Sequence, residues 1–168
     1  MARILTGTIR ASFGLDYRGD ADLGSQKATL PFSDDIGISS GNGNGQANLT
    51  FFDKRTLAAS ASESLDLAGV LLDAFGGAAT FTRVKGIFIR AADTNGGNIV
   101  VGGAPSNAFV GPFADATDKL RIPAGQVFMA TNMGPGWAVT ASTGDLLLIA
   151  NSDAGAAATY DIALIGLS

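Results

Sequence analysis

The chain has 168 residues, of which 46% are hydrophobic and 15% are charged, and its formal net charge is −4. This length is typical of one domain, and no apolar run approaches the length of a membrane span. The absence of cysteine excludes disulfides and thiolate metal sites, and the absence of histidine removes the usual general base. No run of Lys or Arg is longer than Lys54-Arg55, so we expect no nucleic-acid partner, and the lack of a membrane-length apolar run leads us to expect no membrane partner.

The N-terminal region differs in composition from the rest of the chain. Residues 3–13 have strand character with mixed faces, and residues 14–45 are rich in Gly, Asp, Ser and Asn. The segment Gly41-Asn-Gly-Asn-Gly45 suits a tight or flexible turn, because Gly and Asn tolerate positive φ. The start lacks the long apolar core of a signal peptide, and we expect none. We interpret residues 1–47 as an extended N-terminal arm that a neighbour orders by covering it, and residues 48–168 as a separate β-domain.

The second region contains about eight or nine short apolar or alternating runs separated by turn signals. Residues 67–75 change to a helical period, which predicts a helix or a single turn between Asp66 and Gly76. Gly86 lies where the alternation changes face and predicts a bulge. The predicted strands occupy residues 48–57, 60–67, 80–90, 99–101, 120–122, 126–131, 137–140, 145–151 and 159–167.

Two segments carry the signals of β-hairpins. Asn95-Gly96 is the strongest such signal, and Ile99 to Val101 follows it as the returning strand. The last pair of strands flanks a turn of small residues that contains Asp153 and Gly155. Apolar residues occupy both parities of 146–150, so we expect this strand to be buried on both faces.

The number and spacing of the strands predict an all-β fold, either a β-sandwich or a barrel. A jelly-roll-like β-sandwich fits best, because the runs are short and their connections compact, and an up-and-down barrel is the second choice. A surface with so few charges is typical of a protein covered by partners, which favours an oligomer or a lattice component. A monomer coated in Ser, Thr, Asn and Gly is the alternative.

The residues give little indication of catalysis. Glu63 is the single glutamate and lies on the apolar parity of its strand. An ion pair with Arg83 or Arg55, or a side chain that points outward at a sheet edge, is a better interpretation than an active-site role. The loop aspartates Asp16, Asp20, Asp22, Asp34 and Asp35 are interpreted as solvated carboxylates instead of a Ca²⁺ site. We therefore expect no enzyme activity, no metal and no cofactor.

The aromatic residues divide into two groups. Four lie inside strand patterns and are assigned to the core: Phe51, Phe81, Phe88 and Phe128. Four more lie in loop-like segments and are candidates for contact with a partner: Tyr17, Phe109, Phe113 and Trp137.

The region from Ala91 to Ser168 resembles small structural proteins of tailed bacteriophages. The resemblance lies in Val100-Val-Gly-Gly103, Phe109-Val-Gly-Pro-Phe113, Asp118-Lys-Leu-Arg-Ile-Pro-Ala-Gly125, Gly144-Asp-Leu-Leu-Leu-Ile149 and Thr159-Tyr-Asp-Ile-Ala-Leu-Ile165. It implies a virion component of the head decoration (cement) type, which is assembled in the host cytoplasm. Such a protein is usually a β-rich trimer on the surface of the major capsid protein, and its N-terminal arm often reaches neighbouring subunits.

Two other functions remain open from the sequence. One is a tail or fibre-tip module that binds a host receptor or glycan through its loop aromatics, and the other is a carbohydrate-active enzyme or lectin. For the decoration protein, the expected contacts with the capsid and with other copies are Ile4, Leu5, Ile9, Phe13, Tyr17, Leu30, Phe32, Phe109, Phe113 and Trp137.

Overall fold

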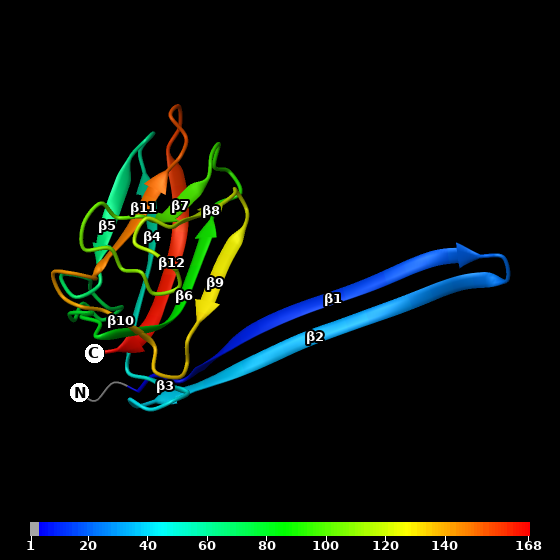
Figure 1. Cartoon of the computed structure of the whole chain (residues 1–168), viewed down its shortest axis with the longest axis horizontal. Coiled ribbons are helices and arrows are strands. Elements are labelled where there is room, and N and C mark those ends of the chain that lie inside the picture. Colours follow the sequence, from blue (N-terminus) through cyan, green and yellow to red (C-terminus); the bar gives the residue numbers. More distant parts are fainter. Residues whose placement is uncertain (1–3) are drawn as a thin grey trace.

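The protein is an all-β structure in which a long N-terminal hairpin projects from a body of two antiparallel sheets (Figure 1). The computed structural model describes residues 4–168, so the predicted strand that begins at Arg3 lies partly outside the described residues. Within residues 4–168 there is no helix, and hence none that could cross a bilayer. The strands are β1 (Gly7–Ala21), β2 (Gly24–Ser40), β3 (Gln46–Ala47), β4 (Leu49–Leu57), β5 (Ser62–Asp66), β6 (Arg83–Ala91), β7 (Ile99–Gly102), β8 (Lys119–Ile122), β9 (Val127–Thr131), β10 (Trp137–Ala138), β11 (Leu146–Asn151) and β12 (Ala158–Leu167).

The body strands pair in a nested order. In the first sheet, β12 lies between β4 and β6, and both β9 and β10 pair with β6. The second sheet has the order β5-β11-β7-β8. Apart from the short β10, the strands of the body pair from the outside of the sequence inward: β4 with β12, β5 with β11, β6 with β9, and β7 with β8. This nesting brings the two ends of the body together in the first sheet.

One hydrophobic core fills the space between the two sheets, an arrangement consistent with a β-sandwich. Alternate residues of β12 are buried, including Tyr160, Ile162 and Leu164, and the same period buries Leu147 and Ile149 in β11. Each such aliphatic side chain stabilises the fold by about 1.5–3 kcal/mol when it leaves water. The apolar runs that predicted these strands thus place every second residue in the core.

The bulge predicted at Gly86 is confirmed. Ile165 pairs with Gly86 and the next residue, Gly166, pairs with Val84, so Lys85 is the extra residue on β6. The bulge turns Lys85 inward, and its side chain is only 1% exposed.

Of the two alternatives predicted for residues 67–75, a helix or a single turn, the helix is wrong. This segment is a series of turns, in which the Asp66 carboxylate accepts the backbone N–H of Ala68 and Asp73 accepts those of Phe75 and Gly77. Side-chain acceptors of this kind offer the backbone an alternative to helical hydrogen bonds. Leu67 and Leu71 enter the core, whereas Val70 and Phe75 are exposed. The helix-like spacing of apolar residues therefore comes from two leucines that anchor a loop to the core.

Both hairpin predictions for the body are also wrong, because each turn connects one sheet to the other. The turn at Asn95 leads from β6 in the first sheet to β7 in the second, and the Asp153 turn leads from β11 back to β12. The Asn95 side chain pairs with Thr159 of β12, donating to its carbonyl at 2.9 Å and accepting its N–H at 2.8 Å. The two-sided burial expected for residues 146–150 is likewise wrong, since Leu146 and Leu148 are only half-buried.

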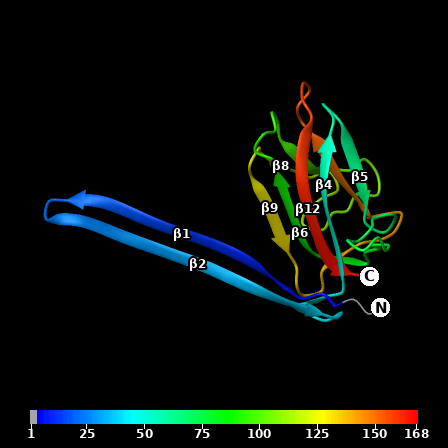
Figure 2. The ribbon, with the colours of Figure 1, turned by 180° about the vertical axis from the view of Figure 1, so that it is seen from behind.

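The N-terminal hairpin is more regular than the composition of residues 14–45 suggested. Strands β1 and β2 contain 15 and 17 residues and pair in unbroken antiparallel register from Gly7↔Ile38 to Ala21↔Gly24. A strand of this length spans about 50 Å. Both views show the hairpin leading away from the body (Figures 1 and 2).

Candidate assembly surface

One face of the N-terminal hairpin is apolar along most of its length. The odd-numbered residues of β1 and the even-numbered residues of β2 share this face, since Phe13 lies opposite Phe32 and Leu15 opposite Leu30. We call this set the hairpin face: Ile9, Phe13, Leu15, Tyr17, Leu30, Phe32 and Ile36. Opposed aromatic and branched pairs stabilise a two-stranded ribbon by about 0.2–1 kcal/mol each.

The other face of the hairpin is polar. Arg10 donates to both carboxylate oxygens of Asp35 at 2.7 and 2.8 Å, and this bond raises the pKa of Arg10. Farther along, Asp16 accepts from the Thr29 hydroxyl at 2.9 Å and pairs with Lys27 at 3.0 Å. Exposed ion pairs of this kind add little stability. They do make this face compatible with water, which the apolar face is not.

The hairpin face is open to solvent. Phe13 is 53% exposed, Phe32 59% and Tyr17 79%, and the two leucines are about as exposed. Together these side chains expose about 600 Å² of apolar surface, taking typical side-chain areas. This is the upper end of the range for the largest apolar patch on a soluble monomer, and patches of that size mark interaction sites.

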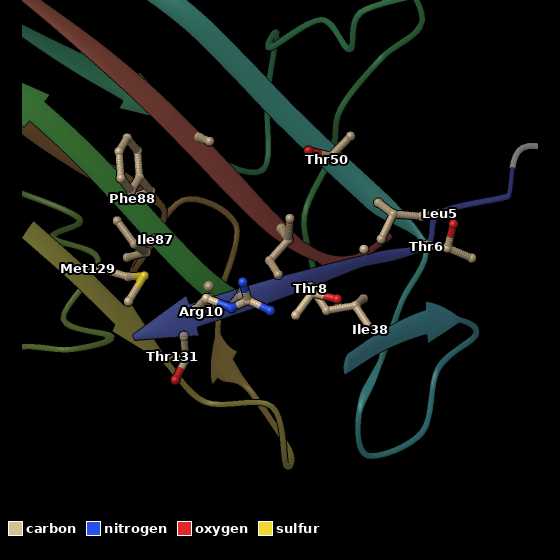
Figure 3. A pocket seen from close by; sticks show the side chains of 15 residues that line it. Leu5, Thr6, Thr8, Arg10, Ile38, Thr50, Ile87, Phe88, Met129 and Thr131 are labelled. Atoms are coloured by element: carbon tan, nitrogen blue, oxygen red, sulfur yellow. The ribbon is translucent and has the colours of Figure 1, made fainter. Parts of the chain in front are cut away.

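A groove of about 500 Å³ lies where the hairpin meets the body (Figure 3). It is formed by Leu5 and Ile9 before and within β1, by Ile38 of β2, and by the outward side of the first sheet. In Figure 3 the side chains of Phe88 and Met129 lie at the sheet side of this groove, and Thr50 and Leu5 lie toward the start of the hairpin.

The outward side of the first sheet carries a second apolar strip. Strand register places Phe52, Ala163, Phe88 and Met129 in one row across β4, β12, β6 and β9. The adjacent row contains Ile165 beside Gly86. Val127, two residues before Met129, lies on the same side of β9. We call this set the outer face: Phe52, Phe88, Val127, Met129, Ala163 and Ile165. Phe88 was expected in the core, and its 37% exposure corrects that prediction.

Lys85 fixes the base of the hairpin to the body. Its ammonium group donates to the carbonyl of Gly43 at 2.6 Å, in the turn that follows β2. Burial lowers the pKa of Lys85, and the charge of Arg83 lowers it further. In the same region the N–H of Gly45 donates to the carbonyl of Met133 at 2.8 Å. These bonds hold the hairpin in a defined direction from the body.

The charged cluster around Glu63 joins the two sheets. Arg55 of β4 donates from Nε to Glu63 Oε2 of β5 at 2.8 Å, and the hydroxyl of Tyr160 in β12 donates to Glu63 Oε1 at 2.9 Å. The bond to Glu63 raises the pKa of Arg55, and burial followed by the same carboxylate raises the pKa of Tyr160. The predicted ion pair with Arg55 is therefore confirmed, and every partner of Glu63 here serves to fix the sheets.

Replacing Glu63 tests this structural role. We expect Glu63→Ala to lower the free energy of unfolding by about 2 kcal/mol, because the buried Tyr160 hydroxyl loses its acceptor. Glu63→Gln keeps an acceptor and is expected to cost about 1 kcal/mol. Urea unfolding measures both, and particle assembly and any binding should be unchanged in Glu63→Gln. Loss of a hydrolytic activity in that variant would contradict the structural role.

The structure separates the predicted contact residues into two groups. Ile4, Phe13, Tyr17, Leu30 and Phe32 are exposed, and Leu5 and Ile9 are half-buried at the base of the hairpin.

The three loop aromatics lie elsewhere. Phe109 is 2% exposed within the core, which corrects its expected exposure, and Phe113 and Trp137 are half-buried against the core.

Sequence reasoning missed Leu15 and Ile36 on the hairpin face, and Phe52 and Met129 on the outer face. The alternation of Phe13, Leu15 and Tyr17 was a usable signal for the first set. For metal binding, residues 4–168 contain no group of three or more acidic side chains placed to hold an ion.

The chain matches no model of a protein family, no curated protein and no solved structure.

Proposed function

We propose that the protein is a bacteriophage head decoration (cement) protein that binds the outer surface of the major capsid lattice. The observation that carries this proposal is the hairpin face, an extended apolar strip held away from the body. A two-stranded hairpin is marginal in water by itself. Its apolar side chains contribute nothing to the body's core. Such a segment is useful when another protein covers it, as happens in an assembly.

The architecture of the body supports the same proposal. Nested antiparallel pairing of eight strands in two sheets is the pattern of a jelly roll, a fold common among capsid proteins. The hairpin then takes the part of the N-terminal arm, reaching from a jelly-roll body to neighbouring subunits. Self-association would cover the hairpin face, and the resemblance to decoration proteins favours a trimer. The assembled protein would lie at the virion surface after assembly in the host cytoplasm.

A passive structural role also agrees with the chemistry of the chain. Glu63 is engaged by Arg55 and Tyr160, which supports a protein that is not an enzyme. With a net charge of −4, the chain offers no support for a nucleic-acid partner. The glycan-binding alternative depended on loop aromatics, and it loses support because Phe109 is buried.

Removing residues 2–40 tests the proposed function. We expect the truncated protein to bind capsids that lack it at least about tenfold more weakly, because it has lost the hairpin and with it the contacts to neighbouring subunits in the assembly. The body should still fold, since its core begins at Leu49. Co-sedimentation with capsids measures attachment, and circular dichroism with thermal unfolding measures the fold.

A second variant covers the case in which truncation disturbs the body. Phe13→Ser with Phe32→Ser keeps the whole chain and changes the hairpin face alone, and it should weaken attachment to a similar degree. Ser12→Ala with Ser33→Ala alters the opposite face of the hairpin and serves as the matched control. Full attachment of the Phe13/Phe32 variant, or only a handful of copies per particle, would contradict the proposal.

A further inference from the structure

We propose that the hairpin face of one copy packs on the outer face of a second copy, so that the chains associate head to tail. This names the partner of the hairpin. It rests on the proposed role of the hairpin in assembly, and it does not require a capsid. Four features of the two surfaces support this pairing over the alternatives.

The first feature is area. On the outer face, Phe52 is 58% exposed and Val127 51%, and Phe88 and Met129 are 37% and 39% exposed. These side chains expose about 350 Å² of apolar surface, by the typical areas used for the hairpin face. Joining the two faces would bury roughly 1,000 Å² in total, the area at which specific protein interfaces begin. Among residues 4–168, the base of the hairpin covers the outer face near Ile165, and Phe52, Phe88, Val127 and Met129 stay exposed.

The second feature is shape. Small residues occupy the middle of the outer face, with Ala163 between Phe52 and Phe88 and Gly86 in the next row. A hollow of about 470 Å³ lies over Ala163, with both aromatic rings on its sides. The opposed rings of Phe13 and Phe32 protrude from the hairpin face and supply side chains of the size needed to fill such a hollow.

The third feature is a contact that the chain already makes. Ile9, at the base of the hairpin face, lies against the outer face of its own body. Its Cδ1 is 3.5 Å from the position that a Cβ on Gly86 would occupy, next to Ile165. The outer face therefore accepts an apolar side chain of β1, and a neighbour's hairpin would extend the same contact across the row of Phe52 and Phe88.

The fourth feature is charge. Asp34 is the one carboxylate that shares the hairpin face, two residues from Phe32 on the same strand. On the outer face, Lys54 lies two residues from Phe52, in a row in which Asp161 stands between Lys54 and Arg90 and pairs with Arg90 at 3.1 Å, so the row carries one positive charge in excess. Asp34 and Lys54 each lie two residues from the aromatic side chain of their own strand. Docking Phe32 near Phe52 therefore brings the Asp34 carboxylate toward the Lys54 ammonium group. This match favours a second copy over a generic apolar partner.

The geometry of the pairing also predicts the form of the assembly. The two contacting surfaces differ, so the interface is heterologous and either closes into a ring or continues as a filament. A hairpin of about 50 Å can cross a neighbouring body. Closure after three copies would agree with the trimer proposed above, and each copy would then use both of its faces.

Two variants and their mixture test the inference without any capsid. The hairpin variant carries Phe13→Ser and Phe32→Ser, and the sheet variant carries Phe52→Ser and Phe88→Ser. We expect the purified wild-type chain to form a closed oligomer at micromolar concentration, measured by analytical ultracentrifugation. Each variant alone should be monomeric, with association weakened by about a hundredfold or more. Mixed in equal amounts they should form a one-to-one dimer, because one intact hairpin meets one intact sheet.

Each other outcome overturns the inference. Oligomers of the sheet variant alone would mean that hairpins pack on hairpins, and oligomers of the hairpin variant alone would mean that sheets pack directly. A monomeric wild-type chain, or a mixture that stays monomeric, would exclude the pairing. Ser12→Ala with Ser33→Ala is the matched control and should associate as the wild type does, and thermal unfolding checks that every variant keeps its body.

The results also separate this inference from the proposed function. A ring in solution that does not attach to capsids would support the inference and contradict the decoration role. A monomer that attaches to capsids through its hairpin would do the reverse.

Discussion

Replacing Gly166 with alanine is expected to lower the free energy of unfolding of the body by about 3 kcal/mol or more. Gly166 lies in β12 beside the bulge of β6, where the backbone of the two strands comes close. A Cβ at this position would overlap the carbonyl oxygen of Arg83 and would lie 3.0 Å from the ring of Phe81. Because the first of these atoms belongs to the backbone, relief requires the central strand pair of the first sheet to separate.

Urea unfolding followed by the fluorescence of Trp137, the single tryptophan, measures this effect. Trp137 pairs with Val84 and packs on the core, so its emission reports the body. Gly155→Ala is the matched control, since a Cβ there meets only the Asp153 carboxylate at an ordinary 3.6 Å. Equal stability of the two variants would show that the strands can shift at Gly166 without cost.

The strands of the body were predictable because each has one face in the core. Alternation in residues 62–66 and the apolar runs of β11 and β12 reflect burial on one side of a sheet, which a single sequence records directly. Pairing was not predictable in the same way. An Asn-Gly turn reverses the chain whether the next strand joins the same sheet or the opposite one. In the structure the Asn95 side chain makes two hydrogen bonds with the backbone of Thr159, so the turn is held by a strand that lies far away in the sequence.

For the N-terminal hairpin, in contrast to the body, the strands themselves were not predicted over most of their length. Its residues have the composition of a loop, because only every second position is apolar and Gly, Asp and Ser occupy many of the others. Cross-strand pairing brings Phe13 to Phe32 and Leu15 to Leu30, and only this register reveals one continuous apolar face. Composition averages the two faces of a strand, whereas the period of two keeps them apart. The large residues of the hairpin, such as Phe13 and Phe32, were predicted one by one as contact residues. The continuous face that they form was not predicted.

The outer face was missed for a related reason. Phe52 and Phe88 lie in strands that also contribute to the core, and an aromatic residue in such a strand is normally assigned to the inside. Both residues have the parity of the outward side, which became clear only from their alignment with Ala163. Large apolar residues on the outward side of a sheet, beside small ones, are a feature that the fold alone does not require. Their presence is what connects the body to the assembly proposed for the hairpin.

The free energy of unfolding is expected to fall as the pH rises above about 10, by roughly 1.4 kcal/mol per pH unit from Tyr160. Burial in the core raises the pKa of Tyr160, and the hydrogen bond to Glu63 raises it further. Below about pH 10 the hydroxyl is protonated in both states, so its stabilising effect is fully present. Above that pH the unfolded chain ionises and gains stability while the folded chain does not, and the stabilisation is lost progressively toward the raised folded pKa.

Urea unfolding at about pH 9 and about pH 11 measures this slope, and Tyr160→Phe should flatten it because the titrating group is gone. The lowered pKa of Lys85 acts in the opposite direction at lower pH, between that lowered pKa and the ordinary lysine pKa of about 10.5, since the folded state there favours the neutral amine. For that reason the comparison is made between variants and not on the wild type alone. Tyr17→Phe, on the exposed hairpin face, is the matched control with the same tyrosine count. An equal slope in the two variants would mean that the Tyr160 hydroxyl is not held in the core by Glu63, and that the junction between the sheets is looser than its hydrogen bonds indicate.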